Sequence, residues 1–60
     1  MKFYQAVVAV TDTVSVYRIR KDNSQILITM VNISHINNII SVIGIRPREE
    51  DYQADNWKVF

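Results

Sequence analysis

The stretch VSVYRIRKDNSQILITMV, which runs from Val14 to Val31, limits how the rest of the chain can be arranged because it predicts a β-hairpin. Asp22 and Asn23 lie at its tip, and both residue types tolerate the positive φ that a two-residue hairpin loop requires. The register that follows pairs Ile19 with Ile26, Tyr17 with Ile28, and Ser15 with Met30. A slip of one residue would exchange the faces of one strand, so the matching side-chain types across these pairs support this register.

The two faces of this hairpin differ near its tip. The paired isoleucines and tyrosine make one face apolar, whereas Arg18 and Arg20 lie on the other. Further from the tip the second face also becomes apolar, at Val14, Val16 and Val31. We therefore expect a sheet with more apolar surface than a chain of this size easily covers.

Composition limits the class of protein. Sixty residues make one small domain, spanning residues 1–60, and the content of 48% hydrophobic and 22% charged residues is typical of a globular chain. The chain has no cysteine, which excludes disulfides and thiolate metal sites and fits a cytoplasmic location. No apolar run approaches the roughly 20 residues that a membrane-spanning helix needs, so no membrane contact is expected.

The segment FYQAVVAV, from Phe3 to Val10, predicts a strand that is covered on both sides, because it is apolar almost throughout. Thr11-Asp12-Thr13 then forms a short turn into the next strand. A three-residue loop would place Val7 on the face of Tyr17, whereas a two- or four-residue loop would place Val8 there. A second apolar face remains in either case.

The segment from Ser34 to Ile43 predicts a helix, because isoleucines recur at helical spacing: Ile33, Ile36, Ile40 and Ile43. Gly44 suits the left-handed residue just past the end of such a helix. Intrinsic propensity opposes this interpretation, since Ile, Val, Asn and Ser are mediocre helix formers. The alternative is a turn at Asn37-Asn38 followed by a strand over Ile39–Ile45, because short β-branched runs are hard to assign by period.

The last quarter of the chain contains a helix start and a turn. Pro47 is followed by Glu49, Glu50 and Asp51, which resembles a helix beginning with solvated acidic residues. Asp55-Asn56 predicts a turn, and residues 57–60 form a short edge strand or an anchored tail. The predicted fold is therefore α+β: a three-stranded antiparallel β-meander, one helix packed on one face, and a C-terminal segment that is a short helix or an edge strand.

Catalytic, metal and cofactor motifs are lacking. His35 is the only histidine, and no cysteine can join it at a metal site. Its neighbour Ser34 would not face it on a helix, so no nucleophile and base pair is implied. The acidic residues lack the alternating ligands and the sharp glycine turn of a calcium loop. We expect a protein that is not an enzyme and that holds no cofactor.

The surplus of apolar surface leads to a functional hypothesis. We expect this chain to act by binding another protein, for instance by occluding, and so modulating or inhibiting, a larger enzyme, and to form a homodimer. Aromatic residues and arginine are enriched at binding hot spots. Together with the second apolar face and the basic hairpin face, this predicts the following partner-binding residues: Tyr4, Val16, Arg18, Arg20, Arg46, Arg48, Trp57 and Phe60.

The alternative hypothesis is nucleic-acid binding through Arg18, Arg20 and Lys21. The two arginines share a strand face, but Tyr17 points to the opposite one and cannot stack bases beside them. The net charge of +1 also gives no long-range attraction to a polyanion. Protein binding is therefore the preferred hypothesis.

Overall fold

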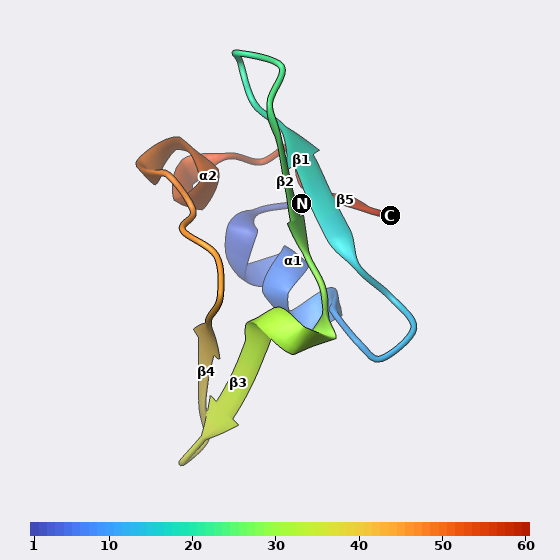
Figure 1. Cartoon of the computed structure of the whole chain (residues 1–60), viewed down its shortest axis with the longest axis vertical. Coiled ribbons are helices and arrows are strands. Elements are labelled where there is room, and N and C mark those ends of the chain that lie inside the picture. Colours follow the sequence, from blue (N-terminus) through green and yellow to red (C-terminus); the bar gives the residue numbers. More distant parts are fainter.

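Both helices lie on one face of a three-stranded antiparallel sheet, and a separate two-stranded hairpin projects from one end of the molecule (Figure 1). This computed structural model describes all residues from 1 to 60. The helices are α1 (Phe3–Ala9) and α2 (Glu49–Gln53), with a 3₁₀ turn, η1, at Met30–Asn32. The strands are β1 (Val16–Ile19), β2 (Gln25–Ile28), β3 (Ile33–Ile36), β4 (Ile39–Val42) and β5 (Lys58–Val59).

The predicted α+β class with antiparallel sheets is confirmed, but the third strand of the sheet comes from the other end of the chain. The strand order is β2-β1-β5, and β5 pairs antiparallel with β1. The sheet is therefore no meander, because its third strand is Lys58–Val59 and not the segment from Phe3 to Val10. The C-terminal segment contains both predicted alternatives, the short helix α2 and the edge strand β5.

The first hairpin is confirmed, but its predicted register is wrong by one residue. The loop has three residues, because the Arg20 N–H donates to the Ser24 carbonyl at 2.8 Å and Asn23 adopts a φ of 70°. A turn followed by one left-handed residue is a common three-residue hairpin loop. The resulting pairs are Val16 with Ile28, Tyr17 with Leu27, Arg18 with Ile26, and Ile19 with Gln25.

Residues 3–9 form helix α1, so the predicted strand over Phe3–Val10 is wrong. The segment is apolar enough to satisfy both the strand period and the helix period. On the helix, Phe3, Ala6, Val7 and Val10 share the face that packs on the sheet, at the spacing of an amphipathic helix. The Gln5 side chain accepts a hydrogen bond from the Lys2 N–H at 2.9 Å, which satisfies one of the free donors at the start of the helix.

Residues 33–42 form the hairpin β3–β4, so the predicted helix over Ser34–Ile43 is wrong and the alternative with a turn at Asn37-Asn38 is confirmed. Both asparagines have positive φ, 53° and 64°, as the two central residues of a type I′ turn require. Gly44 is left-handed, as predicted, but it follows a strand. A segment rich in β-branched residues, with two turn-forming asparagines at its centre, favours a hairpin over a helix.

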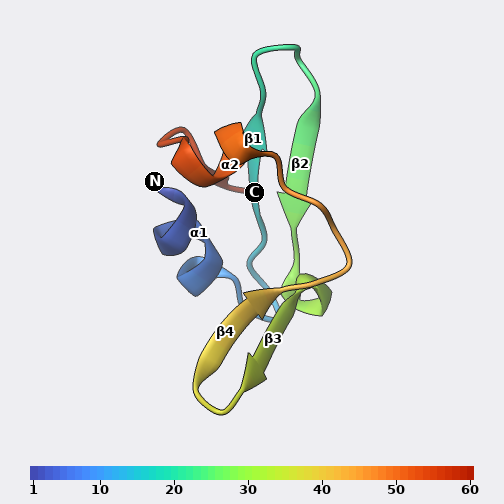
Figure 2. The same cartoon turned by 90° about the vertical axis from the view of Figure 1, so that its left-hand side faces the viewer.

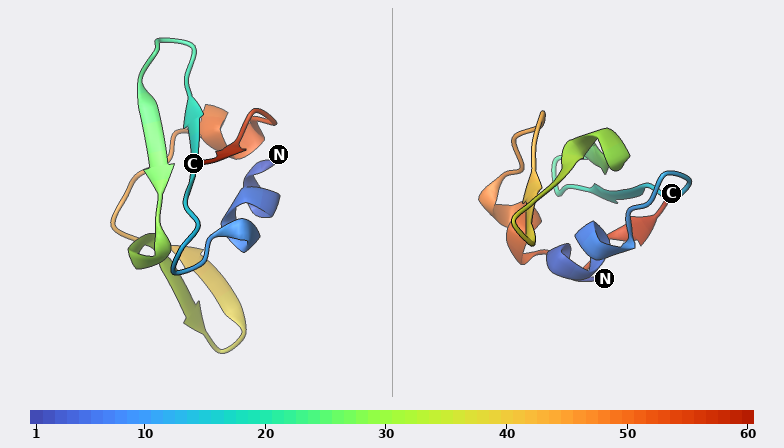
Figure 3. Two further views of the ribbon diagram at one scale, coloured as in Figure 1. Left: turned by 90° about the vertical axis from the view of Figure 1, so that its right-hand side faces the viewer. Right: turned by 90° about the horizontal axis from the view of Figure 1, so that it is seen from below.

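The core lies between the sheet and the two helices (Figure 3). Trp57 is its largest fully buried side chain, with 1% of its surface exposed, and Val16 and Ile28 reach it from the sheet. Phe3 packs edge-on against Trp57 with ring centroids 5.6 Å apart. The hairpin β3–β4 extends beyond this core (Figure 2). Most of its isoleucines are exposed.

Candidate functional site

The sheet has one face that no helix covers, which we call the outer sheet face. Strand alternation and the observed register place six residues on it: Tyr17, Ile19, Gln25, Leu27, Lys58 and Phe60. The opposite face of the same strands carries Val16, Arg18, Ile26 and Ile28, all buried. The sheet thus has a second, uncovered face, but the residues predicted for it, Val14, Val16 and Val31, do not lie there.

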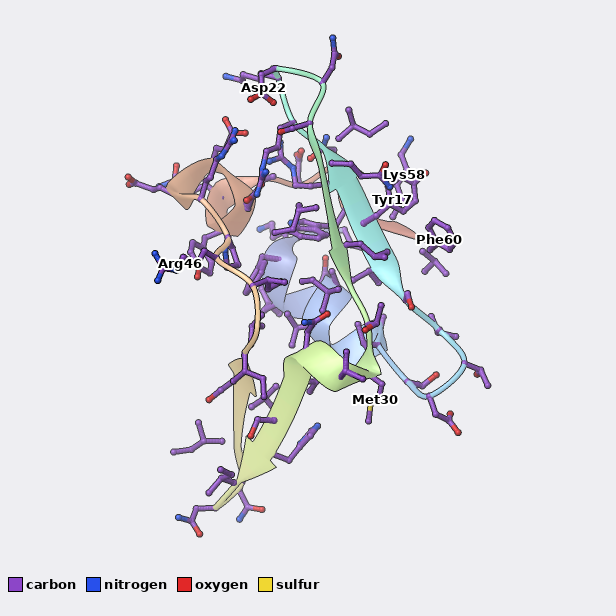
Figure 4. The ribbon with its side chains drawn as sticks, viewed as in Figure 1. Tyr17, Asp22, Met30, Arg46, Lys58 and Phe60 are labelled. Carbon is purple, nitrogen blue, oxygen red and sulfur yellow. The ribbon has the colours of Figure 1, made fainter.

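An aromatic pair forms the centre of the outer sheet face. The rings of Tyr17 and Phe60 meet edge to face, with centroids 5.8 Å apart, and Phe60 remains 76% exposed. The two side chains lie next to each other beside Lys58 on β5 (Figure 4). Such rigid aromatic groups bury a large area at low cost in side-chain entropy, which suits them for protein contact.

Polar groups surround this aromatic centre. A hollow of about 100 Å³ lies beside Tyr17 and Ile19, and Asn56 and Lys58 form its polar side. Asn56 is held in place because its side-chain amide donates to the Ile19 carbonyl at 3.2 Å. An apolar centre with a polar rim is the usual anatomy of a protein interface.

Three predicted partner-binding residues lie inside the core, so the prediction that they contact a partner is corrected. Val16 is fully buried, Trp57 is 1% exposed and Arg18 is 5% exposed. The one-residue difference in register explains Arg18, because it turns this side chain from the open face to the covered one. Trp57 fills the space between the helices and the sheet, where its Nε1–H donates to the Asp51 carbonyl at 3.0 Å.

Arg18 and Arg20 both bind the carboxylate of Asp51, which is fully buried at the start of α2. Arg20 forms a two-pronged contact, with Nε 3.0 Å from Oδ1 and Nη2 2.7 Å from Oδ2. Arg18 donates to Oδ1 through Nη1 and to Asn56 through Nε at 2.8 Å. Asp51, predicted as one of several solvated acids, is thus the centre of a buried ionic cluster.

The cluster also fixes the start of helix α2. The Arg48 backbone N–H donates to Asp51 Oδ2 at 2.7 Å, so the carboxylate satisfies a free donor at the helix start as well as two cations. Burial alone would raise the pKa of Asp51, but the hydrogen bonds from Arg20, Arg48 and Arg18 outweigh it and lower the pKa to about 2. The hydrogen bond to Asp51 in turn raises the pKa of Arg20.

This lowered pKa predicts a loss of stability in acid. An unfolded chain has an Asp51 pKa near the ordinary value of 3.8, so between pH 7 and pH 5 the carboxylate is ionised in both states. As the pH falls from about 4 towards 2, the unfolded state binds a proton that the folded state does not, and the free energy of unfolding drops by about 2–3 kcal/mol. Urea unfolding followed by far-ultraviolet circular dichroism at each pH measures this drop. A profile that stays flat down to pH 2 would contradict it.

Of the remaining predicted residues, Arg20 is mostly buried beside Asp51, with 10% of its side chain exposed, and the others are exposed but lie apart. Arg46 and Phe60 are on opposite sides of the molecule in Figure 4. Arg48 reaches the tip of the first hairpin, where its Nη1 lies 2.9 Å from Asp22 Oδ2. Hydrogen bonds from Ser24 and then Arg48 hold the pKa of Asp22 below its usual range. Of the predicted set, only Phe60 lies on the outer sheet face, and its contact with a partner stays a prediction.

Tyr4 belongs to a different surface, an apolar groove next to the hairpin β3–β4. The groove has a volume of about 300 Å³ and is lined by seven apolar or aromatic side chains from α1, β4 and α2: Phe3, Tyr4, Val7, Val8, Ile40, Val42 and Tyr52. Tyr4 is 64% exposed at its rim. We call this surface the apolar groove.

Sequence reasoning missed most of the outer sheet face, because Tyr17, Ile19 and Leu27 were expected elsewhere or given no role. The signal that could have found them is the choice between a two- and a three-residue loop at residues 21–23, since this choice decides which side chains are covered. His35 is exposed on β3. No group of three or more His, Asp or Glu side chains is placed to hold a metal ion.

Comparison with known proteins identifies no relative from which a role could be transferred. No protein-family model, no curated protein and no solved structure matches this chain. The fold contains no helix long and apolar enough to cross a membrane.

Proposed function

We propose that this chain acts by binding another protein through the outer sheet face, and that it is not an enzyme. The observation that carries the proposal is the Tyr17–Phe60 pair, in which Phe60 is exposed and Tyr17 is half-buried, on a sheet face that no helix covers. Ile19 and Leu27 extend the apolar centre, with 52% and 40% of their surfaces exposed. Burying such a patch against a partner removes apolar surface from water.

The chemistry of this face indicates what kind of partner fits it. Its only charged side chain is Lys58, which stands beside the aromatic pair (Figure 4). A matching partner surface presents an apolar patch with a carboxylate at its edge, opposite the lysine. Modulation or inhibition of a larger enzyme is one result of such docking, because a bound chain of this size covers part of the enzyme's surface.

Nothing in the arrangement favours the nucleic-acid alternative. Two of its three cations, Arg18 and Arg20, direct their guanidinium groups to Asp51. A phosphate would have to displace a buried carboxylate from both arginines, at the cost of the fold. Protein binding therefore remains the proposal that we prefer.

The test compares variants of the outer sheet face for the same captured protein. The wild-type chain, immobilised through a flexible tag, is used to recover a binding protein from cell extract, and that protein is then purified for titration. We expect Phe60→Ala and Leu27→Ala to weaken its binding at least tenfold, because truncation of a central apolar anchor costs about 1–2 kcal/mol or more.

The matched control is Val8→Ala, which removes an exposed aliphatic side chain from α1, on the other side of the sheet. It should bind as tightly as the wild type. Circular dichroism verifies that all three variants are folded. Equal affinity of Phe60→Ala, Leu27→Ala and the wild type would show that the outer sheet face is not the binding surface.

A further inference from the structure

The strand β4 has a free edge whose backbone groups are arranged to pair with another strand. The Ile43 N–H donates to the Asn32 carbonyl at 2.8 Å, so this pair is hydrogen-bonded. Hydrogen-bonded and non-hydrogen-bonded pairs alternate along an antiparallel hairpin. The pair of Ser34 and Ser41 is therefore hydrogen-bonded as well, whereas Ile40 and Val42 direct their N–H and C=O groups away from β3.

This edge carries none of the usual protection. Exposed edges in natural sheets are commonly blocked by lysine, proline or a bulge. The segment from Ile33 to Ile45 contains no lysine, arginine, acid or proline. Four of its six isoleucines are exposed, with 65% of the surface of Ile39 and 49% of that of Ile43 in solvent. The edge is thus an uncharged strand, apolar except for Ser41, with open hydrogen-bonding groups.

The apolar groove lies beside the same edge. The side chains of Ile40 and Val42 line it, and these are the residues whose backbone groups are free. Tyr4 and Val8 of α1 form its other side, both largely exposed. A strand added to β4 would therefore gain backbone hydrogen bonds and place alternate side chains against the groove.

We propose that a second copy of this chain occupies this edge, with the two β4 strands antiparallel about a twofold axis through Ser41. In this register Ile40 of each copy faces Val42 of the other, and each such pair exchanges two backbone hydrogen bonds. The two hairpins become one four-stranded sheet in the order β3-β4-β4-β3. The free edge is then closed in both copies.

The sequence of β4 supports a second copy as the occupant. Around Ser41 it reads Ile39-Ile40-Ser41-Val42-Ile43, with a small residue at the centre and aliphatic residues on both sides. A twofold axis there brings like residues together and meets no charge, so the surface is complementary to itself. The outer sheet face takes no part in this contact, so the inference does not depend on the proposed function.

A single cysteine tests the twofold axis. The chain has no cysteine, so Ser41→Cys introduces its only thiol. Directly opposed residues of a non-hydrogen-bonded pair have Cβ atoms about 4.5–5.5 Å apart, within reach of a disulfide after a small adjustment. We expect mild oxidation to convert most of this variant to a covalent dimer on non-reducing gels, at a rate that is independent of dilution while the dimer persists.

Ser34→Cys is the matched control, because it places the same thiol one strand further from the axis. The two β3 strands of the proposed sheet are separated by three strand spacings of about 4.8 Å, or about 14 Å, which is too far for a disulfide. Cross-linking of Ser34→Cys as fast as Ser41→Cys would overturn the proposed pairing.

A proline at the edge tests the hydrogen bonds without relying on a disulfide. Ile40→Pro removes an N–H that points away from β3, so the hairpin keeps its own bonds while the contact between copies loses one bond in each direction. Light scattering on a sizing column should show a dimer for the wild type and a dissociation constant raised at least tenfold for this variant. His35→Pro makes the same change at the opposite edge and should remain dimeric.

Each outcome decides the inference. A wild-type monomer at all concentrations, or an Ile40→Pro variant as dimeric as the wild type, would overturn it. If Ile40→Pro binds the partner with wild-type affinity, the proposed function stands. If Phe60→Ala loses partner binding while its dimer is unchanged, the proposed function also stands. The failure of one proposal is therefore distinguishable from the failure of the other.

Discussion

Asp51→Asn is expected to leave most of the protein unfolded at 25 °C. The carboxylate is fully buried and carries the only full negative charge that Arg18 and Arg20 both contact at hydrogen-bonding distance. An amide offers a single acceptor oxygen and turns its NH₂ group towards a cation, so at least one guanidinium loses its partner. Breaking a buried ion pair costs about 3–5 kcal/mol. A chain of this size rarely has more than about 3–5 kcal/mol of total stability.

Urea unfolding followed by circular dichroism measures this loss as a fall in the transition midpoint. The matched control is Glu49→Gln, which makes the same chemical change on the same helix at an exposed position. Its free energy of unfolding should stay within about 0.5 kcal/mol of the wild-type value. A midpoint for Asp51→Asn equal to that of Glu49→Gln would show that the ionic cluster contributes little to the fold.

Trp57→Ala is the second change expected to unfold the chain. Trp57 is the largest fully buried side chain, and it packs against Phe3 with ring centroids 5.6 Å apart. Truncation of a buried tryptophan to alanine removes about 3–5 kcal/mol through lost burial and the cavity that remains. Trp57→Phe keeps a ring but leaves the Asp51 carbonyl without its donor, so it should cost about 1–3 kcal/mol.

The two Trp57 variants should therefore fall in order below the wild type in urea or thermal unfolding, with the alanine variant lowest. Phe60→Ala serves as the control, because this aromatic residue is 76% exposed and its loss should change stability by about 0.5 kcal/mol or less. If Trp57→Ala and Phe60→Ala are equally stable, the core does not depend on Trp57 as the structure indicates.

The turns of this fold could be predicted from the sequence, whereas two long apolar segments could not. Asp22-Asn23, Asn37-Asn38 and Asp55-Asn56 all mark changes of chain direction, because Asn and Asp adopt left-handed or turn conformations at little cost. In residues 3–9 and 33–42 the spacing of the apolar residues fits both the period of a helix and that of a strand. Over residues 33–42 the structure adopts the alternative with a turn at Asn37-Asn38, whereas over residues 3–9 it adopts a helix, which was not among the expected conformations.

The candidate site could be predicted only as a surplus of apolar surface. The sheet does have an uncovered face, but its members depend on a single loop residue. A three-residue loop at residues 21–23 places Tyr17 on the uncovered face and buries Arg18, which reverses the faces expected for β1. Because successive side chains of a strand point to opposite faces, an error of one residue in register assigns every side chain of that strand to the wrong face.

By itself the sequence determined the places where the chain turns, the amount of apolar surface and the start of the last helix, because these depend on neighbouring residues. The tertiary structure decided that residues 3–9 form a helix and not a strand, and it decided the face on which Arg18 lies. An arginine can face a core only when a carboxylate meets it there, and Asp51 is 33 residues away along the chain. Such a pairing depends on a contact between distant segments, so local patterns of charge and hydrophobicity do not reveal it.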